Sequence, residues 1–85
     1  MPAKNLQLAQ NADKNLSKLP KHIQTKILFS FDKIKENPVS GIKLHGELKN
    51  YYKFRVGDYR IVYRFNSKES LVKVVKIEHR QGVYK

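Results

Sequence analysis

Every arginine of this chain lies in its second half. Arg55 and Arg60 flank a Gly-Asp pair, Arg64 follows four residues later, and Arg80 lies near the end of the sequence. A planar guanidinium group can bind phosphate oxygens through two parallel hydrogen bonds, whereas a lysine offers a point charge. Lysines, by contrast, are spread over the whole chain. The positions of the arginines therefore indicate an anion-binding surface on a few neighbouring strands.

Gly57 and Asp58 separate two runs in which apolar and polar residues alternate, which is typical of a two-residue β-hairpin turn. With these two residues as the loop, Arg55 stands directly opposite Arg60. Alternation then separates two faces. The face that should pack on the helices carries Tyr52, Phe54, Val56, Tyr59, Ile61 and Tyr63. The opposite face should be cationic and carries Tyr51, Lys53, Arg55, Arg60, Val62 and Arg64.

The opposed pair Arg55 and Arg60 is unusual for a purely structural sheet. Like charges in direct opposition destabilise a hairpin by about as much as a good cross-strand pair stabilises it, roughly 0.2–1 kcal/mol. A bound anion would relieve this repulsion. The alternative is an outer sheet face that is charged only because it is solvated. The residue pattern alone leaves both interpretations open.

Two tyrosines and a histidine lie near the cationic residues. Tyr51 shares their face and Tyr84 follows Arg80 in a polar tail, so either ring could stack on a nucleobase. His79 adjoins Arg80 and is a candidate proton acceptor. Spacings typical of a zinc site or of a glycine-rich phosphate loop are absent. We expect neither a metal nor a cofactor.

Helical elements precede the strands. Leu6 and Leu8 alternate with polar neighbours and indicate a short first strand, after which Asn11 is the expected N-cap of a helix that begins near Ala12. Pro20 suits the first turn of a second helix. Apolar residues follow at helical spacing up to the stop at Asn37-Pro38; they are Ile23, Ile27, Phe31 and Ile34, with Leu28 beside them.

Strand-forming residues dominate from Tyr51 to Ile77, after a connector that holds Pro38, Gly41 and Gly46. A polar segment from Asn66 to Ser70 predicts a second turn. The predicted fold class is α+β, with two N-terminal helices in a hairpin packed on one face of a small antiparallel β-sheet.

Length and charge narrow the class of protein. The 85 residues, 10.0 kDa, have room for a single domain, residues 1–85, with an open cleft rather than an enclosed pocket. A net charge of +11 favours a polyanionic partner, nucleic acid above all. The absence of cysteine fits a reducing cytoplasm. No apolar run approaches the roughly 18 residues of a membrane span, so no membrane partner is expected.

Three segments together resemble the RelE branch of the RelE/ParE toxin superfamily, and the match covers nearly the whole chain. The resemblance implies a RelE-like fold with a short first strand, the toxin of a type II toxin-antitoxin pair, and an mRNA endoribonuclease that acts in the ribosomal A site. Its partners would be a cognate antitoxin and ribosome-bound mRNA. The segments are Leu44-His45-Gly46-Glu47-Leu48, Tyr52 to Tyr63, and His79-Arg80-Gln81-Gly82-Val83-Tyr84.

The resemblance also implies site residues. The positions where RelE-like toxins keep catalytic basic residues and a base-stacking tyrosine carry Lys53, Arg55, Arg60, Arg80 and Tyr84. Arg55 departs from the best-known members, which have lysine there. Further candidates at the edge of the site are His79, Tyr51 and Arg64.

Cleavage of RNA by its own 2′-hydroxyl needs a base at that hydroxyl, stabilisation of charge on phosphorus-bound oxygens and a proton for the 5′-oxygen. We hypothesise that Arg55 and Arg60 hold the scissile phosphate, that Arg80 stabilises or protonates the leaving oxygen and that Tyr84 stacks a base. Lys53 would be the base, because neighbouring cations favour its neutral form. His79 is the competing base.

The sequence is also compatible with two other functions. A ParE-like toxin would inhibit DNA gyrase by protein contact, although such members generally lack the basic set found here. A non-catalytic module that binds RNA or the ribosome would explain the charge equally well and would leave RNA uncut.

Overall fold

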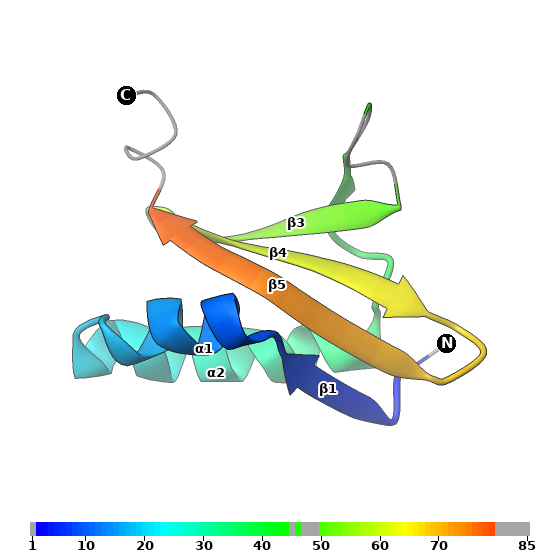
Figure 1. Cartoon of the computed structure of the whole chain (residues 1–85), viewed down its shortest axis with the longest axis horizontal. Helices are drawn as coiled ribbons and strands as arrows, with labels where there is room; N and C mark the ends of the chain where they lie inside the picture. The colour runs from blue at the N-terminus through cyan, green and yellow to red at the C-terminus, as the bar shows by residue number, and fades with distance from the viewer. Residues whose placement is uncertain (1, 45, 47–49, 80–85) are drawn as a thin grey trace.

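Two helices cover one face of a twisted sheet in the computed structural model, which describes residues 2–44, 46 and 50–79 (Figure 1). The strand order within these residues is β1-β5-β4-β3-β2. β1 pairs with β5 in parallel and the other pairs are antiparallel. The predicted α+β class is confirmed, with a parallel pair at one edge. The elements are β1 (Asn5–Leu8), α1 (Gln10–Ser17), α2 (Lys21–Glu36), β2 (Ile42–Lys43), β3 (Tyr51–Val56), β4 (Tyr59–Asn66) and β5 (Leu71–His79).

The start of α1 differs from the prediction. The helix begins at Gln10, and the N-cap position is held by Ala9, which makes no side-chain cap, rather than by Asn11. The Ala9 N–H donates to the carbonyl of Val74 on β5 at 2.8 Å. The chain therefore passes directly from the sheet into the helix, and strand pairing sets the start of α1 in place of a capping side chain.

α2 begins directly after Pro20 and ends before Asn37-Pro38, in agreement with the sequence. Its inner face is buried at Ile27, Phe31 and Ile34. Leu28 does not join that face, because 51% of it is exposed, and its neighbour Phe29 is 67% exposed. α2 thus carries a second, outward-facing apolar patch.

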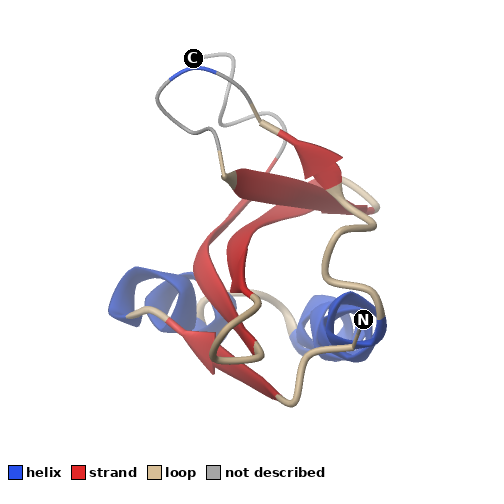
Figure 2. Ribbon diagram, turned by 90° about the vertical axis from the view of Figure 1, so that its right-hand side faces the viewer, coloured by secondary structure: helices blue, strands red, loops and turns tan. Residues whose placement is uncertain are grey.

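The hydrophobic core lies between the helices and the sheet. Figure 2 shows both helices along the lower part of the view and the sheet curving away from them. The strand residues predicted to face the helices do so: Ile61 and Tyr63 are buried, and Tyr52, Phe54, Val56 and Tyr59 pack against the core. Burial of this face holds the opposite face of β3 and β4 away from the helices. Other buried core residues are Ala12, Ile27, Phe31, Ile34, Val72, Val74 and Ile77.

Tyr63 ties the connector after α2 to the sheet. Its hydroxyl donates to the carbonyl of Pro38 at 2.9 Å and accepts from the Gly41 N–H at 3.2 Å. A Cβ on Gly41 would lie 2.7 Å from both the Lys53 carbonyl oxygen and the Tyr63 hydroxyl oxygen, so this position requires glycine. Burial raises the pKa of Tyr63 above its ordinary value, outweighing the hydrogen bond from Gly41.

Two residues of this connector, Ile42 and Lys43, pair with β3 as strand β2, which the sequence analysis did not predict. No helix within the described ranges is long and apolar enough to cross a membrane.

Candidate functional site

The β3-β4 hairpin has the predicted register. Gly57 turns the chain with φ +59°, and Arg55 stands opposite Arg60. β5 continues the row, with Glu78 opposite Arg60. In the next row Lys53 and Lys76 stand on either side of Val62. The face of the sheet that points away from the helices, here called the outer face, therefore carries cations on three adjacent strands.

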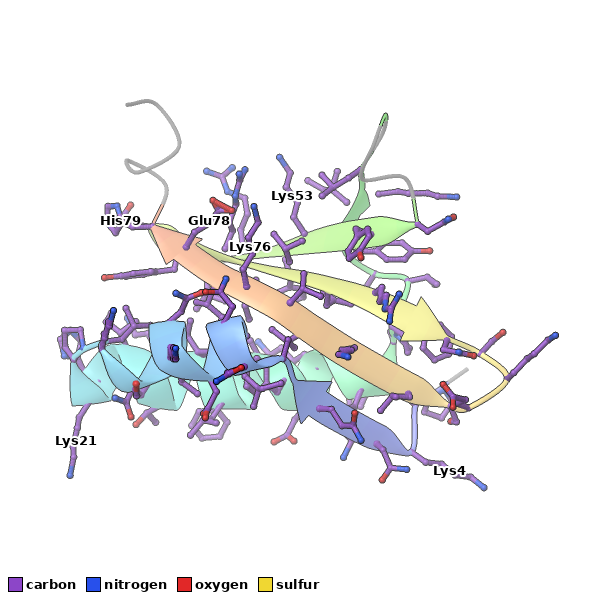
Figure 3. All side chains as sticks on the ribbon, in the orientation of Figure 1. Lys4, Lys21, Lys53, Lys76, Glu78 and His79 are labelled. Carbon is purple, nitrogen blue, oxygen red and sulfur yellow. The ribbon has the colours of Figure 1, made fainter. Side chains whose placement is uncertain are left out.

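Four of these cations and one carboxylate form what we call the cation cluster: Lys53, Arg55, Arg60, Lys76 and Glu78. Figure 3 shows Lys53, Lys76 and Glu78 on the side of the sheet opposite the helices. One Glu78 carboxylate oxygen lies 3.4 Å from Arg60 Nη2 and 3.2 Å from Lys76 Nζ. One carboxylate among four cations leaves the cluster positively charged.

Glu78 corrects the electrostatic argument made from the sequence. A bound anion was one of two interpretations of the opposed Arg55 and Arg60, and the fold instead supplies a carboxylate from β5 beside them. The register of β5 explains why the sequence did not reveal this. β4 and β5 slip by one residue between Val62 and Tyr63, so counting back from the turn misplaces Glu78.

Arg60 is nevertheless not fully satisfied. Its Nε–H is buried and has no hydrogen-bond acceptor within the part of the chain that the structure describes. A buried donor without an acceptor destabilises a fold by about 1–3 kcal/mol, and such groups mark places where a ligand can add a hydrogen bond. Because the Arg60 side chain as a whole is 28% exposed, the accessible part of its guanidinium group can still bind an anion.

His79 lies on the other side of the sheet. It pairs with Tyr59, and the two rings meet edge to face with centroids 4.8 Å apart. Tyr59 packs against the core. Strand alternation therefore turns His79 away from the cation cluster, although it is the neighbour of Glu78 in sequence.

The other candidate residues are distributed as follows. Tyr51 pairs with Arg64 on the outer face, further from the hairpin turn than the cation cluster. Arg80 and Tyr84 lie outside the described residues. In the ranges that are described, no three His, Asp or Glu side chains gather in a way that could hold a metal ion.

Residues 6–84 match the family model described as the ParE toxin of type II toxin-antitoxin system, parDE. The chain belongs to this toxin family. It is also 30% identical to Toxin RelG of Mycobacterium tuberculosis over 76 residues, 87% of each chain. The toxin is thus a member of the RelE/ParE superfamily, as its sequence segments indicated.

Solved structures share the toxin's fold. The toxin-antitoxin complex RelBE2 from Mycobacterium tuberculosis aligns with a TM-score of 0.86 at 28% identity, covering 94% of this chain and 93% of that one. The archaeal RelE-RelB complex from Pyrococcus horikoshii aligns at 0.75 with 28% identity, covering 94% and 97%. A free-state mutant of Escherichia coli RelE, 22% identical, has the same fold at 0.81, covering 99% and 90%. The RelE-like architecture with a short first strand is confirmed.

The toxin has a groove beside the cation cluster, between α2 and β3. It encloses about 510 Å³ and has Phe29, Phe54 and Val56 as apolar walls. Lys26, Lys33 and Arg55 bring positive charge to it, and Ser30 completes the lining. Among the described residues, β2 pairs only with Tyr52 and Lys53, so Phe54 to Val56, at the turn end of β3, form a sheet edge at this groove. Arg55 belongs to both the groove and the cation cluster.

Proposed function

We propose that the toxin is a metal-independent endoribonuclease that cuts mRNA in the ribosomal A site and so inhibits translation in the cytoplasm. The observation that carries this proposal is the cation cluster, in which four cations surround the single carboxylate of Glu78. The Arg60 side chain is 28% exposed, so its guanidinium group can reach a phosphate placed there, and the surrounding cations would stabilise the extra negative charge of a pentacoordinate phosphorane. The names RelG and RelE among its relatives support the same class of toxin.

The reaction needs only groups of the chain and of the RNA. Lys53, as the neutral amine, removes the proton of the 2′-hydroxyl, and the 2′-oxygen attacks the adjacent phosphorus. Arg55 and Arg60 hold the phosphoryl oxygens. The bond from phosphorus to the 5′-oxygen breaks, and this oxygen takes a proton from Arg80 or from water. The products are a 2′,3′-cyclic phosphate and a 5′-hydroxyl.

Lys53 suits the role of base better than His79 does. Lys53 projects from the outer face (Figure 3) and lies two residues from Arg55 on β3, whereas the His79 ring packs edge to face against Tyr59. Tyr84 is proposed to stack a base and so to orient the 2′-hydroxyl. Tyr51 and Arg64 continue the outer face and would contact neighbouring nucleotides.

The open position of the cation cluster makes the substrate's geometry critical. An open face holds a flexible RNA strand in many orientations, and only an in-line arrangement of the 2′-oxygen and the 5′-oxygen reacts. The ribosome would supply that arrangement. Primer extension on an mRNA with and without translating ribosomes tests this, with Arg60→Ala beside the matched control Lys21→Ala on α2. We expect the wild type to cut mRNA only when ribosomes are present, Lys21→Ala to cut in the same way, and Arg60→Ala not to cut. Equal cutting of naked mRNA contradicts the ribosome requirement.

Inhibition of DNA gyrase is the second candidate, because the matching family model carries the name ParE. It predicts intact mRNA in arrested cells and loss of supercoiling activity when purified toxin is added to gyrase. Intact but bound RNA, with active gyrase, would instead indicate a non-catalytic RNA-binding module.

The toxin's protein partner is proposed to be a cognate antitoxin, since the solved relatives RelBE2 and RelE-RelB are toxin-antitoxin complexes. The groove between α2 and β3 suits an acidic amphipathic segment, whose apolar residues would contact Phe29 and Phe54 and whose carboxylates would face Lys26 and Lys33. Because Arg55 borders the groove, such a segment would compete with phosphate for it. This competition would couple antitoxin binding to inhibition.

A further inference from the structure

The outer face holds a second pair of opposed cations. Arg64 on β4 stands directly opposite Lys73 on β5, in the row that also contains Tyr51. Unlike Arg60, neither residue has a carboxylate partner: both salt bridges found among the described residues go to Glu78. The repulsion of roughly 0.2–1 kcal/mol between such opposed charges is therefore not offset within the described part of the fold.

These two cations border a cleft of about 400 Å³ at the end of the sheet remote from the hairpin turn. One acidic residue, Glu69, lines the cleft, and its carboxylate accepts a hydrogen bond from the Asn66 side-chain amide at 3.0 Å. Hydrogen-bonding groups and a third cation complete a lining suited to an anion; the further lining residues are Asn50, Phe65, Ser67, Lys68 and Leu71.

We propose that this cleft is a phosphate-binding subsite for the RNA backbone next to the cleaved nucleotide, with Arg64 and Lys73 as its anion-binding residues. The inference rests on the proposed ribonuclease function and extends it. At roughly 3.3 Å per residue, Arg64 lies about 13 Å along β4 from Arg60, on the same face. A single strand bound at the cation cluster can therefore continue over Tyr51, whose ring can stack a base, and reach the cleft.

Charge placement favours RNA over an acidic protein as the occupant. Arg60 and Arg64 on β4 and Lys76 and Lys73 on β5 place cations at both ends of the same two strands, which matches a backbone with regularly repeated charge. The site suited to an acidic segment with apolar residues is the separate groove at α2, where aromatic side chains line the wall. The cleft combines a planar guanidinium group with polar donors, which is the chemistry of phosphate contacts.

RNA binding by the full-length toxin tests the subsite. The probe is a fluorescent single-stranded RNA with 2′-O-methyl groups, which cannot be cleaved by 2′-hydroxyl attack. The double variant Arg64→Gln with Lys73→Gln is compared with Lys18→Gln with Lys21→Gln, which removes the same charge between α1 and α2. We expect the first to raise Kd about tenfold over the second. We also expect the slope of log Kd against log salt to fall by about 1.4, since each phosphate contact on a single strand contributes about 0.7.

The outcomes separate the subsite from the proposed function. An equal loss of binding in both double variants would mean that only net charge matters, and it overturns the subsite. So does unchanged RNA binding with weakened antitoxin binding, which would make the cleft a protein-binding surface. Wild-type toxin that cuts ribosome-bound mRNA while the Arg64 and Lys73 variant binds RNA normally refutes the subsite and leaves the ribonuclease standing. Failure of the wild type to cut mRNA refutes the ribonuclease itself.

Folding of the double variant is checked separately. Removing two opposed cations relieves repulsion, so its melting temperature should equal or exceed that of the wild type. A lower melting temperature would show that Arg64 and Lys73 stabilise the sheet, which contradicts the assignment of these residues to an external anion.

Discussion

Glu78 is the residue whose removal tests the electrostatics of the outer face most sharply. Glu78→Gln keeps the size of the side chain and removes its charge between Arg60 Nη2 and Lys76 Nζ. The three side chains are 25–40% exposed, and each ion pair is therefore worth about 0.2–1 kcal/mol. Restored repulsion between Arg55 and Arg60 adds a similar amount. We expect a loss of about 1–2 kcal/mol in the free energy of unfolding, or about 4–8 °C in melting temperature for each kcal/mol.

Thermal unfolding at two salt concentrations is the assay. The Debye length falls from about 10 Å at 0.1 M to about 3 Å at 1 M salt, so the difference between wild type and Glu78→Gln should shrink at 1 M. Asp32→Asn is the matched control, because Asp32 is an exposed carboxylate on α2 that forms no salt bridge with any described residue. Its melting temperature should stay close to that of the wild type at both concentrations.

RNA affinity gives an independent measure of the same substitution. Glu78→Gln raises the positive charge of the cation cluster, so RNA should bind more tightly at low salt, with a steeper salt dependence. A variant that melts like the wild type at 0.1 M salt would refute the reasoning. In that case Glu78 does not offset the repulsion between Arg55 and Arg60, and an external anion is needed after all.

Three further substitutions test the fold and the partner surface. Gly41→Ala puts a Cβ 2.7 Å from the Lys53 carbonyl and should lower the free energy of unfolding by about 1–3 kcal/mol in urea titrations, and unchanged stability would contradict the close approach. Tyr63→Phe should be about 1–2 kcal/mol less stable at pH 7. The pKa of Tyr63 is raised in the folded state, so above pH ~10 this side chain ionises in the unfolded chain first, and the wild type loses stability that Tyr63→Phe does not lose. The difference in free energy of unfolding between the two proteins should therefore be smaller at pH 11 than at pH 8 in urea titrations; an equal difference at both pH values contradicts this. Phe29→Ser should weaken antitoxin binding in calorimetry by tenfold or more with little change in stability, whereas Leu28→Ser, exposed but outside the groove lining, should not; equal effects would refute the groove.

The hairpin was predictable because a two-residue turn fixes the register of both strands. Gly57 and Asp58 alone set Arg55 opposite Arg60 and assigned each residue of β3, and of β4 as far as Arg64, to a face. The place of Glu78 was not predictable in the same way, since a one-residue slip between β4 and β5 depends on packing across the whole sheet.

Neighbours in sequence can lie on opposite faces, and His79 shows the consequence. The sequence places His79 next to Arg80 and suggests a shared site, but strand alternation directs its ring toward Tyr59. The start of α1 was misplaced for another reason: Asn11 has the right side chain for a cap, yet the helix begins two residues earlier than predicted, directly after Ala9, whose N–H pairs with β5. At the start of α1, a tertiary contact overruled a local preference.

The chemistry of the cleaved ends tests the proposed reaction most directly. mRNA from a reconstituted translation reaction containing the toxin is treated with polynucleotide kinase, with and without prior phosphatase. Attack by the 2′-hydroxyl predicts a downstream fragment that the kinase labels without phosphatase, because its end is a 5′-hydroxyl, and an upstream fragment with a 2′,3′-cyclic phosphate. Both should disappear with Lys53→Met and persist with Lys21→Met. A 5′-phosphate on the downstream fragment, with a 3′-hydroxyl on the upstream fragment, would contradict a reaction by the 2′-hydroxyl at the cation cluster.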